Sequence, residues 1–171
     1  EIIFQDKLSS FQNFYLANCP KGITKVPVFS KITYKNIYDN IDIIFKSTKK
    51  GVKYDIVLHP GAKINDVQFK YDGVKNIQFK KDKIIFETEI QNLEENIPLS
   101  FIEESGESIN IYYKDLKNGV FGFESETDFK NKKVIIDPVL IISSLMNSGI
   151  PIADMIISES KHISFKLLDL L

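Results

Sequence analysis

"YDIVLHPGAKINDVQFKYDG", residues 54–73, sets a His-Pro-Gly turn between two runs in which apolar and polar residues alternate. Alternation with a period of two predicts strands that each bury one face. Pro60 cannot donate to a sheet ladder, and Gly61 tolerates backbone conformations that other residues avoid. We therefore interpret "HPGAKIND" as a loop between two strands. The apolar positions of the two runs are Tyr54, Ile56 and Leu58, then Val67, Phe69 and Tyr71.

The same alternation recurs along the chain, in runs that begin at Ile41, Ile84 and Ile109. Turn-like segments separate the runs: "TKKG" (48–51), "KKDK" (80–83), "ESGES" (104–108) and "LKNG" (116–119). Short strands joined by such turns predict an all-β, antiparallel, β-sandwich-like domain of at least eight strands. The side chains expected in its core are Ile43, Phe45, Ile56, Leu58, Phe69, Phe86 and Ile111.

The chain is expected to divide near residue 140 into a β-sandwich-like domain, 1–140, and a C-terminal appendage or start of a following module, 141–171. "VIIDPVL" (134–140) is apolar on both faces, which predicts a closing strand buried on both sides. Asp137 precedes a proline, and its carboxylate is expected to accept backbone N–H bonds at the bend. Segments 141–147 and 163–171 can each be read as helix or as strand, so the appendage is expected to be short and partly helical.

Composition and charge exclude several classes of protein. The formal charge of −1 over 171 residues lacks the basic field of a typical nucleic-acid binder. No stretch reaches the roughly 18 apolar residues that a membrane-spanning helix needs. Cys19 is the single cysteine, so no intramolecular disulfide can form, and we interpret it as a loop or buried thiol.

The sequence carries no recognisable catalytic motif, and we predict no catalytic, cofactor-binding or metal-ligating residues. Zinc-ligand spacing, a glycine-rich phosphate loop and a GxSxG elbow are all missing, whereas a Ser-His-Asp triad assembled in space stays open. His59 stands at the loop entrance and is interpreted as an exposed or loop-capping residue, because His162 is remote in sequence. The lysines near Lys46 and Lys53, and near Lys80 and Lys83, are interpreted as solubilising hairpin tips.

Three groups of acids have the proximity of glycosidase pairs. They fall in turns or opposite apolar strand residues, so we interpret them as solvated charge. In the pair Tyr112–Tyr113, we expect one ring in the core and the other on the surface, where it could stack on a sugar. The acid groups are Glu94 with Glu95, Glu103 with Glu104, and Glu124 with Glu126 and Asp128.

The order of motifs over about residues 11–140 resembles the N-terminal β-domain that precedes SBBP-type β-propeller repeats in bacterial secreted and cell-surface proteins. Asp39 and Asn40 depart from it, standing where Pro and Gly are common, and the glycine-rich repeats that should follow "DPVL" are absent. The matching residues are Tyr34, Ile37, Tyr38, Ile41 and Asp42, then Tyr54, Asp55, Pro60, Gly61 and Ala62, then Tyr71, Gly73, Ile136, Asp137 and Pro138.

The resemblance implies a bacterial protein exported to the cell surface or secreted, and it implies no activity. The leading expectation is a non-enzymatic module that supports or presents neighbouring domains, or binds another surface protein, in adhesion. A carbohydrate-binding module is the alternative, and two or more aromatic rings in a flat exposed strip would favour it. A hydrolase that uses paired acids is the third class, which a deep pocket with converging carboxylates would favour.

Overall fold

The computed structural model describes residues 1–16, 19–48, 51–72, 74–80, 83–87, 92–129, 131–137, 152–157 and 163–167. These residues form strands in three sheets, and the single helical element among them is the 3₁₀ turn η1 (Ile64–Asp66). The all-β prediction is confirmed. The six-stranded sheet contains, in spatial order, β1 (Ile2–Leu16), β2 (Cys19–Tyr38), β3 (Ile41–Thr48), β4 (Gly51–Leu58), β12 (Val134–Asp137) and β9 (Leu99–Ile102).

The second sheet has five strands and the third has three. All the pairings are antiparallel except one, between β14 and β5. The five-stranded order is β10 (Ile111–Lys117), β11 (Val120–Ser125), β5 (Gln68–Asp72), β14 (Ile163–Leu167) and β13 (Ile152–Ile157). The three-stranded order is β6 (Asn76–Phe79), β7 (Lys83–Glu87) and β8 (Asn92–Asn96).

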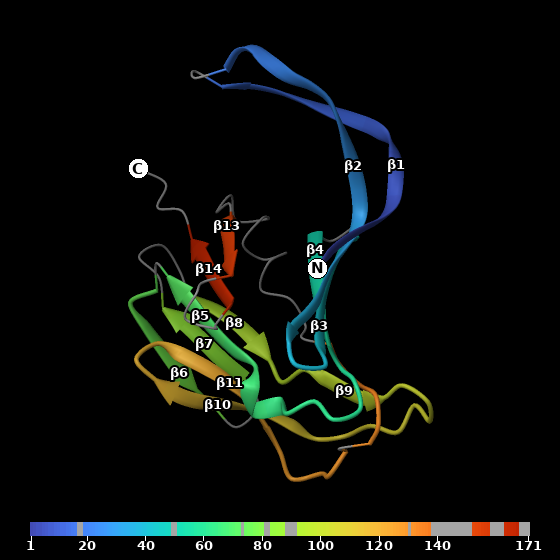
Figure 1. Cartoon of the computed structure of the whole chain (residues 1–171). Coiled ribbons are helices and arrows are strands. Elements are labelled where there is room, and N and C mark those ends of the chain that lie inside the picture. Colours follow the sequence, from blue (N-terminus) through green and yellow to red (C-terminus); the bar gives the residue numbers. More distant parts are fainter. Residues whose placement is uncertain are drawn as a thin grey trace.

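The core lies where the three sheets face one another, with β3 and β4 on one side of the body and β5, β7 and β11 on the other (Figure 1). Aromatic rings join the sheets: Tyr54 of β4 lies 5.9 Å from Phe69 of β5, and Tyr71 of β5 lies 4.5 Å from Phe86 of β7. The predicted core positions are buried, except that Phe45 is only partly so. The alternation of apolar and polar residues therefore predicted correctly which of these side chains face the core.

The "HPGA" segment is the predicted loop. The carbonyl of His59 accepts a 2.9 Å hydrogen bond from the Ala62 N–H, which closes the turn around Pro60 and Gly61. Gly61 has φ +86, a conformation that side chains with a Cβ rarely adopt. The loop then leads through η1 into β5, so it joins the six-stranded sheet to the five-stranded one.

The "VIID" strand, β12, sits between β4 and β9 in the six-stranded sheet. Val134 and Ile136 are buried in the core, whereas Ile135 on the other face is only half-buried. The expected burial on both faces is therefore only partly met at Ile135, although its paired neighbour Val57 on the same face is buried. Residues 138–140 lie outside the described ranges.

The C-terminal part contributes two strands, β13 and β14. Residues 163–167 form a strand, so the helical interpretation is wrong for them and the strand interpretation is right. Residues 141–147 and 168–171 lie outside the described ranges. The division near residue 140 stays a prediction.

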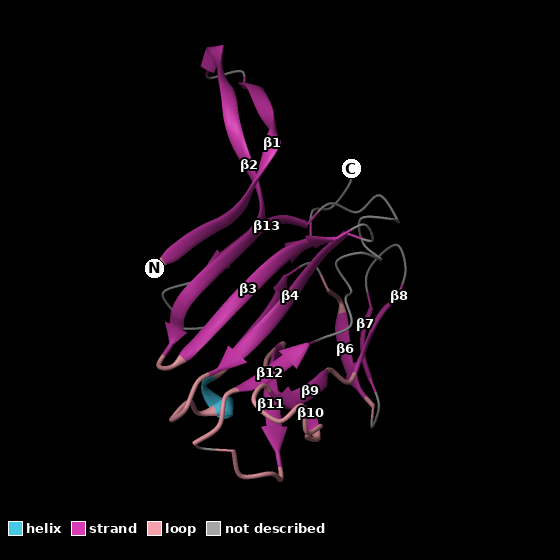
Figure 2. Ribbon diagram, turned by 90° about the vertical axis from the view of Figure 1, so that its right-hand side faces the viewer, coloured by secondary structure: helices cyan, strands magenta, loops and turns pink. Residues whose placement is uncertain are grey.

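The largest feature that the sequence did not predict is the hairpin of β1 and β2. Only the part of β2 from Lys31 onward also pairs with β3. The remainder of the hairpin rises from one end of the body, opposite the end that carries β9 and β12 (Figure 2). We call this projecting part, residues 8–16 and 19–29, the arm.

Candidate functional site

The arm is bent at β-bulges held by specific polar contacts. Asp6 and Lys25 have φ +54 and +58, and the register of β1 against β2 shifts three times between Lys7 and Leu16. The Lys25 N–H donates to Asn13 Oδ1 at 2.8 Å, and Ser30 Oγ donates to the Asp6 carbonyl at 3.3 Å. Bulges increase local twist and bend a strand pair, and the ribbon curves accordingly (Figure 1).

The β1–β2 hairpin carries nearly all the exposed large apolar side chains among the residues that the structure describes. Seven of these eight side chains lie on β1 and β2, and the eighth is Leu99 of β9. Scattered single exposures would be ordinary, but a contiguous group marks an interaction surface. The seven are Ile2, Phe4, Leu8, Phe11, Phe14, Tyr15 and Ile23.

Strand pairing places several of these side chains beside other apolar residues. Phe14 lies opposite Ile23, Phe11 opposite Pro27 and Phe4 opposite Ile32, and directly paired residues point to the same side of a sheet. Ile32 in turn lies opposite Phe45, which packs on the core. The core-facing side of the six-stranded sheet therefore reaches Ile32 and Phe4 at the base of the hairpin. Beyond Lys7 the register shifts, and there Phe11 is 58 % exposed. We call the surface formed by the seven exposed side chains the apolar face of the hairpin.

His59 couples the loop to the start of β3. Its imidazole Nε2 lies 2.8 Å from Asp42 Oδ2, and its backbone N–H donates to the Asn40 carbonyl at 2.9 Å. The other Asp42 oxygen accepts the Asn36 N–H at 2.8 Å. The imidazole thus pairs with a buried carboxylate that also holds the backbone before the β2–β3 turn. This contact fixes the position of the loop against β3.

A cavity of about 590 Å³ lies between the loop 61–66 and the segment 125–131. Lys63, Asp66, Glu126 and Asp128 line it, together with the buried ring of Phe129. Within the described ranges, however, His, Cys, Asp and Glu side chains nowhere gather in the groups of three that a metal ion would need. Nor does any helix in the described part have the length and apolar character to cross a membrane.

The acid pair Glu94–Glu95 corrects the sequence interpretation. Glu94 is exposed and lies 2.7 Å from Lys83 Nζ, as expected of solvated charge. Glu95 is 1 % exposed, because strand neighbours point to opposite faces and β8 turns this position toward Ile84 and the core. The solvated interpretation is therefore wrong for Glu95. The other acids of these groups, Glu103, Glu104, Glu124, Glu126 and Asp128, are exposed.

Three tyrosines from the two larger sheets surround the Glu95 carboxyl. Tyr54 donates to Oε1 at 3.3 Å. Among the described residues, Oε2 has no hydrogen-bond partner. The nearby Tyr113 hydroxyl donates to the Asn96 carbonyl at 3.3 Å, and it also favours the ionised form of the Glu95 carboxyl. Burial dominates, and it raises the pKa of Glu95 from 4.5 to about 7. Tyr71 is equally buried, and Glu95 adds to the burial that raises its pKa.

Tyr113 is the inward member of the Tyr112–Tyr113 pair. Its ring lies 5.4 Å from that of Phe123 and 5.9 Å from that of Phe121. Tyr112 points to the other face of β10 and is half-buried. Tyr113 therefore packs against the core as expected, whereas Tyr112 is half-buried and not exposed on the surface.

Two lysines expected at solvated hairpin tips take part in an ion-pair network on the outer face of the six-stranded sheet. Lys46 pairs with Asp55, and Lys53 pairs with Asp137 and lies 3.8 Å from Asp55 Oδ1. Asp55 is 5 % exposed, so these cations compensate a buried charge. The expectation that Asp137 accepts backbone N–H groups is wrong, because its bound oxygen accepts from Lys53 and Oδ1 has no partner among the described residues.

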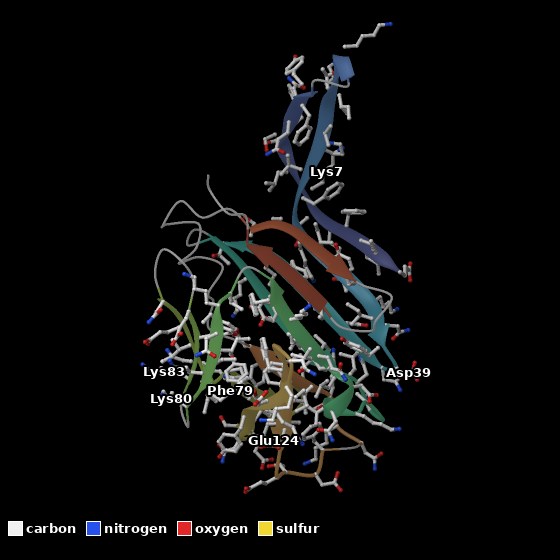
Figure 3. The ribbon with its side chains drawn as sticks, turned by 90° about the vertical axis from the view of Figure 1, so that its left-hand side faces the viewer. Lys7, Asp39, Phe79, Lys80, Lys83 and Glu124 are labelled. Carbon is white, nitrogen blue, oxygen red and sulfur yellow. The ribbon has the colours of Figure 1, made fainter. Side chains whose placement is uncertain are left out.

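The apolar face of the hairpin was not predicted from the sequence. Figure 3 places Lys7 of β1, at the base of the arm, far from Glu124 at the opposite end of the molecule, so the arm is remote from the acids near Glu124. The sequence of residues 1–16 did contain an indication of this surface. Apolar residues are frequent there but follow no period of two, so they match no strand with one buried face.

Comparison with curated proteins and with solved structures finds no match. A family model described as "Domain of unknown function (DUF7948)" matches residues 1–139. The match includes the hairpin, the loop, Glu95 and β12, and it ends before β13. Because it covers most of the sequence, this chain belongs to the DUF7948 family.

Proposed function

We propose that this chain is a non-enzymatic interaction module of a bacterial secreted or cell-surface protein, and that it docks on a neighbouring domain through the apolar face of the hairpin. The observation that carries the proposal is the gathering of seven exposed large apolar side chains on β1 and β2. Phe11 and Phe14 are the expected anchors, since aromatic side chains dominate the binding energy of interfaces. The cell-surface location rests on the resemblance to the domain that precedes SBBP-type repeats.

The partner is expected to present a complementary apolar surface of a β-rich domain in the same polypeptide or in another surface protein. The exposed apolar side chains extend along the hairpin from Ile2 to Ile23, and among the described strands those of the arm pair only with each other. A partner can therefore pack on its face without displacing a described strand. This arrangement favours support or presentation of a neighbouring domain, and adhesion is one use of it.

Carbohydrate binding is the second candidate, and the exposed rings on the hairpin favour it. Phe4, Phe11, Phe14 and Tyr15 are all exposed, and rings of this kind can stack on sugars. Aliphatic side chains, however, interrupt the rings at Leu8 and Ile23, and these offer sugars no hydrogen bonds. A protein surface matches this mixture better.

Site-specific photocrosslinking in the producing cell tests the proposal. A p-benzoyl-phenylalanine at Phe11 should give one dominant protein adduct, which Phe14→Asp should abolish. The same probe at Leu99, exposed but remote from the arm, is the matched control. Adducts equally frequent and equally diverse from both positions would overturn the proposal. Binding to insoluble polysaccharides that Phe11→Ser abolishes, without a protein adduct, would replace it with the carbohydrate function.

A further inference from the structure

The edge of β5 carries a second, independent interaction. On one side β5 pairs with β11 in antiparallel register, from Gln68 opposite Gly122 to Lys70 opposite Val120. On the other side β14 pairs with it in parallel, from Ile163 opposite Phe69 to Lys166 opposite Asp72. This is the one parallel ladder among the described strands, and parallel pairs are slightly less stable per residue.

Among the described strand pairings, the β13–β14 hairpin is joined to the body through this one edge. β13 pairs with β14, and β14 pairs with β5. Residues 138–151 separate the hairpin from β12, and the family match ends at residue 139, before the hairpin begins. The body therefore corresponds to the family module, and the hairpin comes from the sequence that follows it.

The body has a core of its own. Its buried cluster runs from Ile41 to Ile136, and Phe69 and Tyr71 of β5 point into it. β5 also retains its ladder to β11 when β14 is removed. Removal of β14 would leave an open row of backbone N–H and C=O groups along β5, and such a row can pair with another strand.

We propose that the edge of β5 is a strand-acceptor site and that the β13–β14 hairpin is its detachable ligand, so that the same hairpin from a second copy of this chain can occupy it. Recognition comes from main-chain hydrogen bonds, as in other cases of strand addition. Because each copy carries both the donor and the acceptor, exchange pairs two chains without any new surface. The site lies on a different sheet from the arm, so failure of either proposal leaves the other standing.

The test uses the full chain with Ser164→Pro and Phe165→Pro. N–H groups of successive strand residues point to opposite neighbours, so this pair removes one donor toward β5 and one toward β13. Ser164→Ala with Phe165→Ala is the matched control, which changes the same side chains and keeps both donors. The probe is a fluorescent peptide of residues 151–168, with a scrambled peptide beside it.

We expect the proline variant to keep the unfolding midpoint of the body within a few degrees and to bind the peptide at least tenfold more tightly than the unmodified chain does. Binding should slow hydrogen exchange at residues 68–72, and the scrambled peptide should not bind. Unfolding of the body in the proline variant would show that the hairpin is an integral strand and would overturn the proposal. A folded body that fails to bind the peptide, or protects another segment, would overturn it as well.

Discussion

Glu95 is the residue whose environment most changes the properties of the folded chain. Its carboxyl comes from β8 and meets tyrosines of β4, β5 and β10, so it links the three-stranded sheet to both larger ones. A buried carboxyl is costly when ionised and inexpensive when protonated. The result is a group that titrates near neutrality inside the core.

The Glu95 pKa predicts how stability changes with pH. The folded pKa, about 7, lies above the unfolded value, so the folded chain binds more protons between pH 4.5 and 7. The stabilisation from the neutral carboxyl is therefore complete below about pH 4.5 and is lost as the pH rises through 7. At about 1.36 kcal/mol per pKa unit, the loss is on the order of 3 kcal/mol.

Glu95→Gln should remove this dependence, since the amide keeps the shape and cannot ionise. We expect the variant to exceed the unmodified chain in free energy of unfolding at pH 8 and to lose that advantage at pH 4.5, as measured by urea denaturation. Glu94→Gln, which changes the exposed neighbour, is the control and should change little. Equal pH slopes in all three proteins would show that Glu95 is not the titrating group.

Gly61 offers a second test at the residue scale. A Cβ built there would meet only Asn40 Nδ2 at 3.5 Å, so space is sufficient and the cost comes from φ +86. Gly61→Val should lower the free energy of unfolding by roughly 1–3 kcal/mol, whereas Pro60→Ala beside it should matter less. Thermal unfolding of the two variants measures the difference. A Gly61→Val variant as stable as the unmodified chain would mean that the loop adopts another backbone conformation without cost.

At the scale of elements, the inner strands and the arm differ in what their aromatic side chains do. Phe86 is buried between Tyr71 and Phe121, with ring centroids at 4.5 and 5.8 Å. Phe11 is exposed on the arm. The first side chain stabilises the fold, and the second is available to a partner.

Truncation of each ring should separate the two roles. Phe86→Ala should cost about 3–5 kcal/mol of stability, because it leaves a cavity in the core. Phe11→Ser should change the free energy of unfolding by less than about 1 kcal/mol, as surface substitutions usually do. Chemical denaturation measures the free energy of unfolding of both variants. A large loss of stability in Phe11→Ser would show that the arm is a structural element of the fold.

The same elements show what the sequence could predict. The inner strands largely keep a period of two, so their core-facing side chains and the turns between them were predictable from Ile41 to Tyr113. In β1 the bulges after Lys7 and Gln12 interrupt that period, so its apolar residues match no strand pattern. Glu95 was missed because burial depends on which residue lies opposite it, here Ile84, and "LEEN" itself suggests a solvated turn.

On the scale of the whole molecule, the three sheets form a body that is closed around its own core, and the arm extends from it (Figure 2). The ion pairs of Asp55 and Asp137 compensate charges on the outer face of that body. The Glu95 cluster inside it makes the stability depend on pH. The apolar face of the hairpin contributes little to the core and remains exposed. This exposure is what supports the proposed contact with another domain.

The affinity for the protein captured by crosslinking tests this claim most directly. The dissociation constant should be measured for the unmodified chain, for Phe11→Ser with Phe14→Ser, and for Leu99→Ser. Loss of two aromatic anchors, each worth about 2 kcal/mol, removes about 4 kcal/mol and predicts binding roughly 700-fold weaker for the arm variant. Leu99→Ser should stay within about threefold of the unmodified chain. An arm variant that binds as tightly as the unmodified chain, while Leu99→Ser does not, would contradict the account.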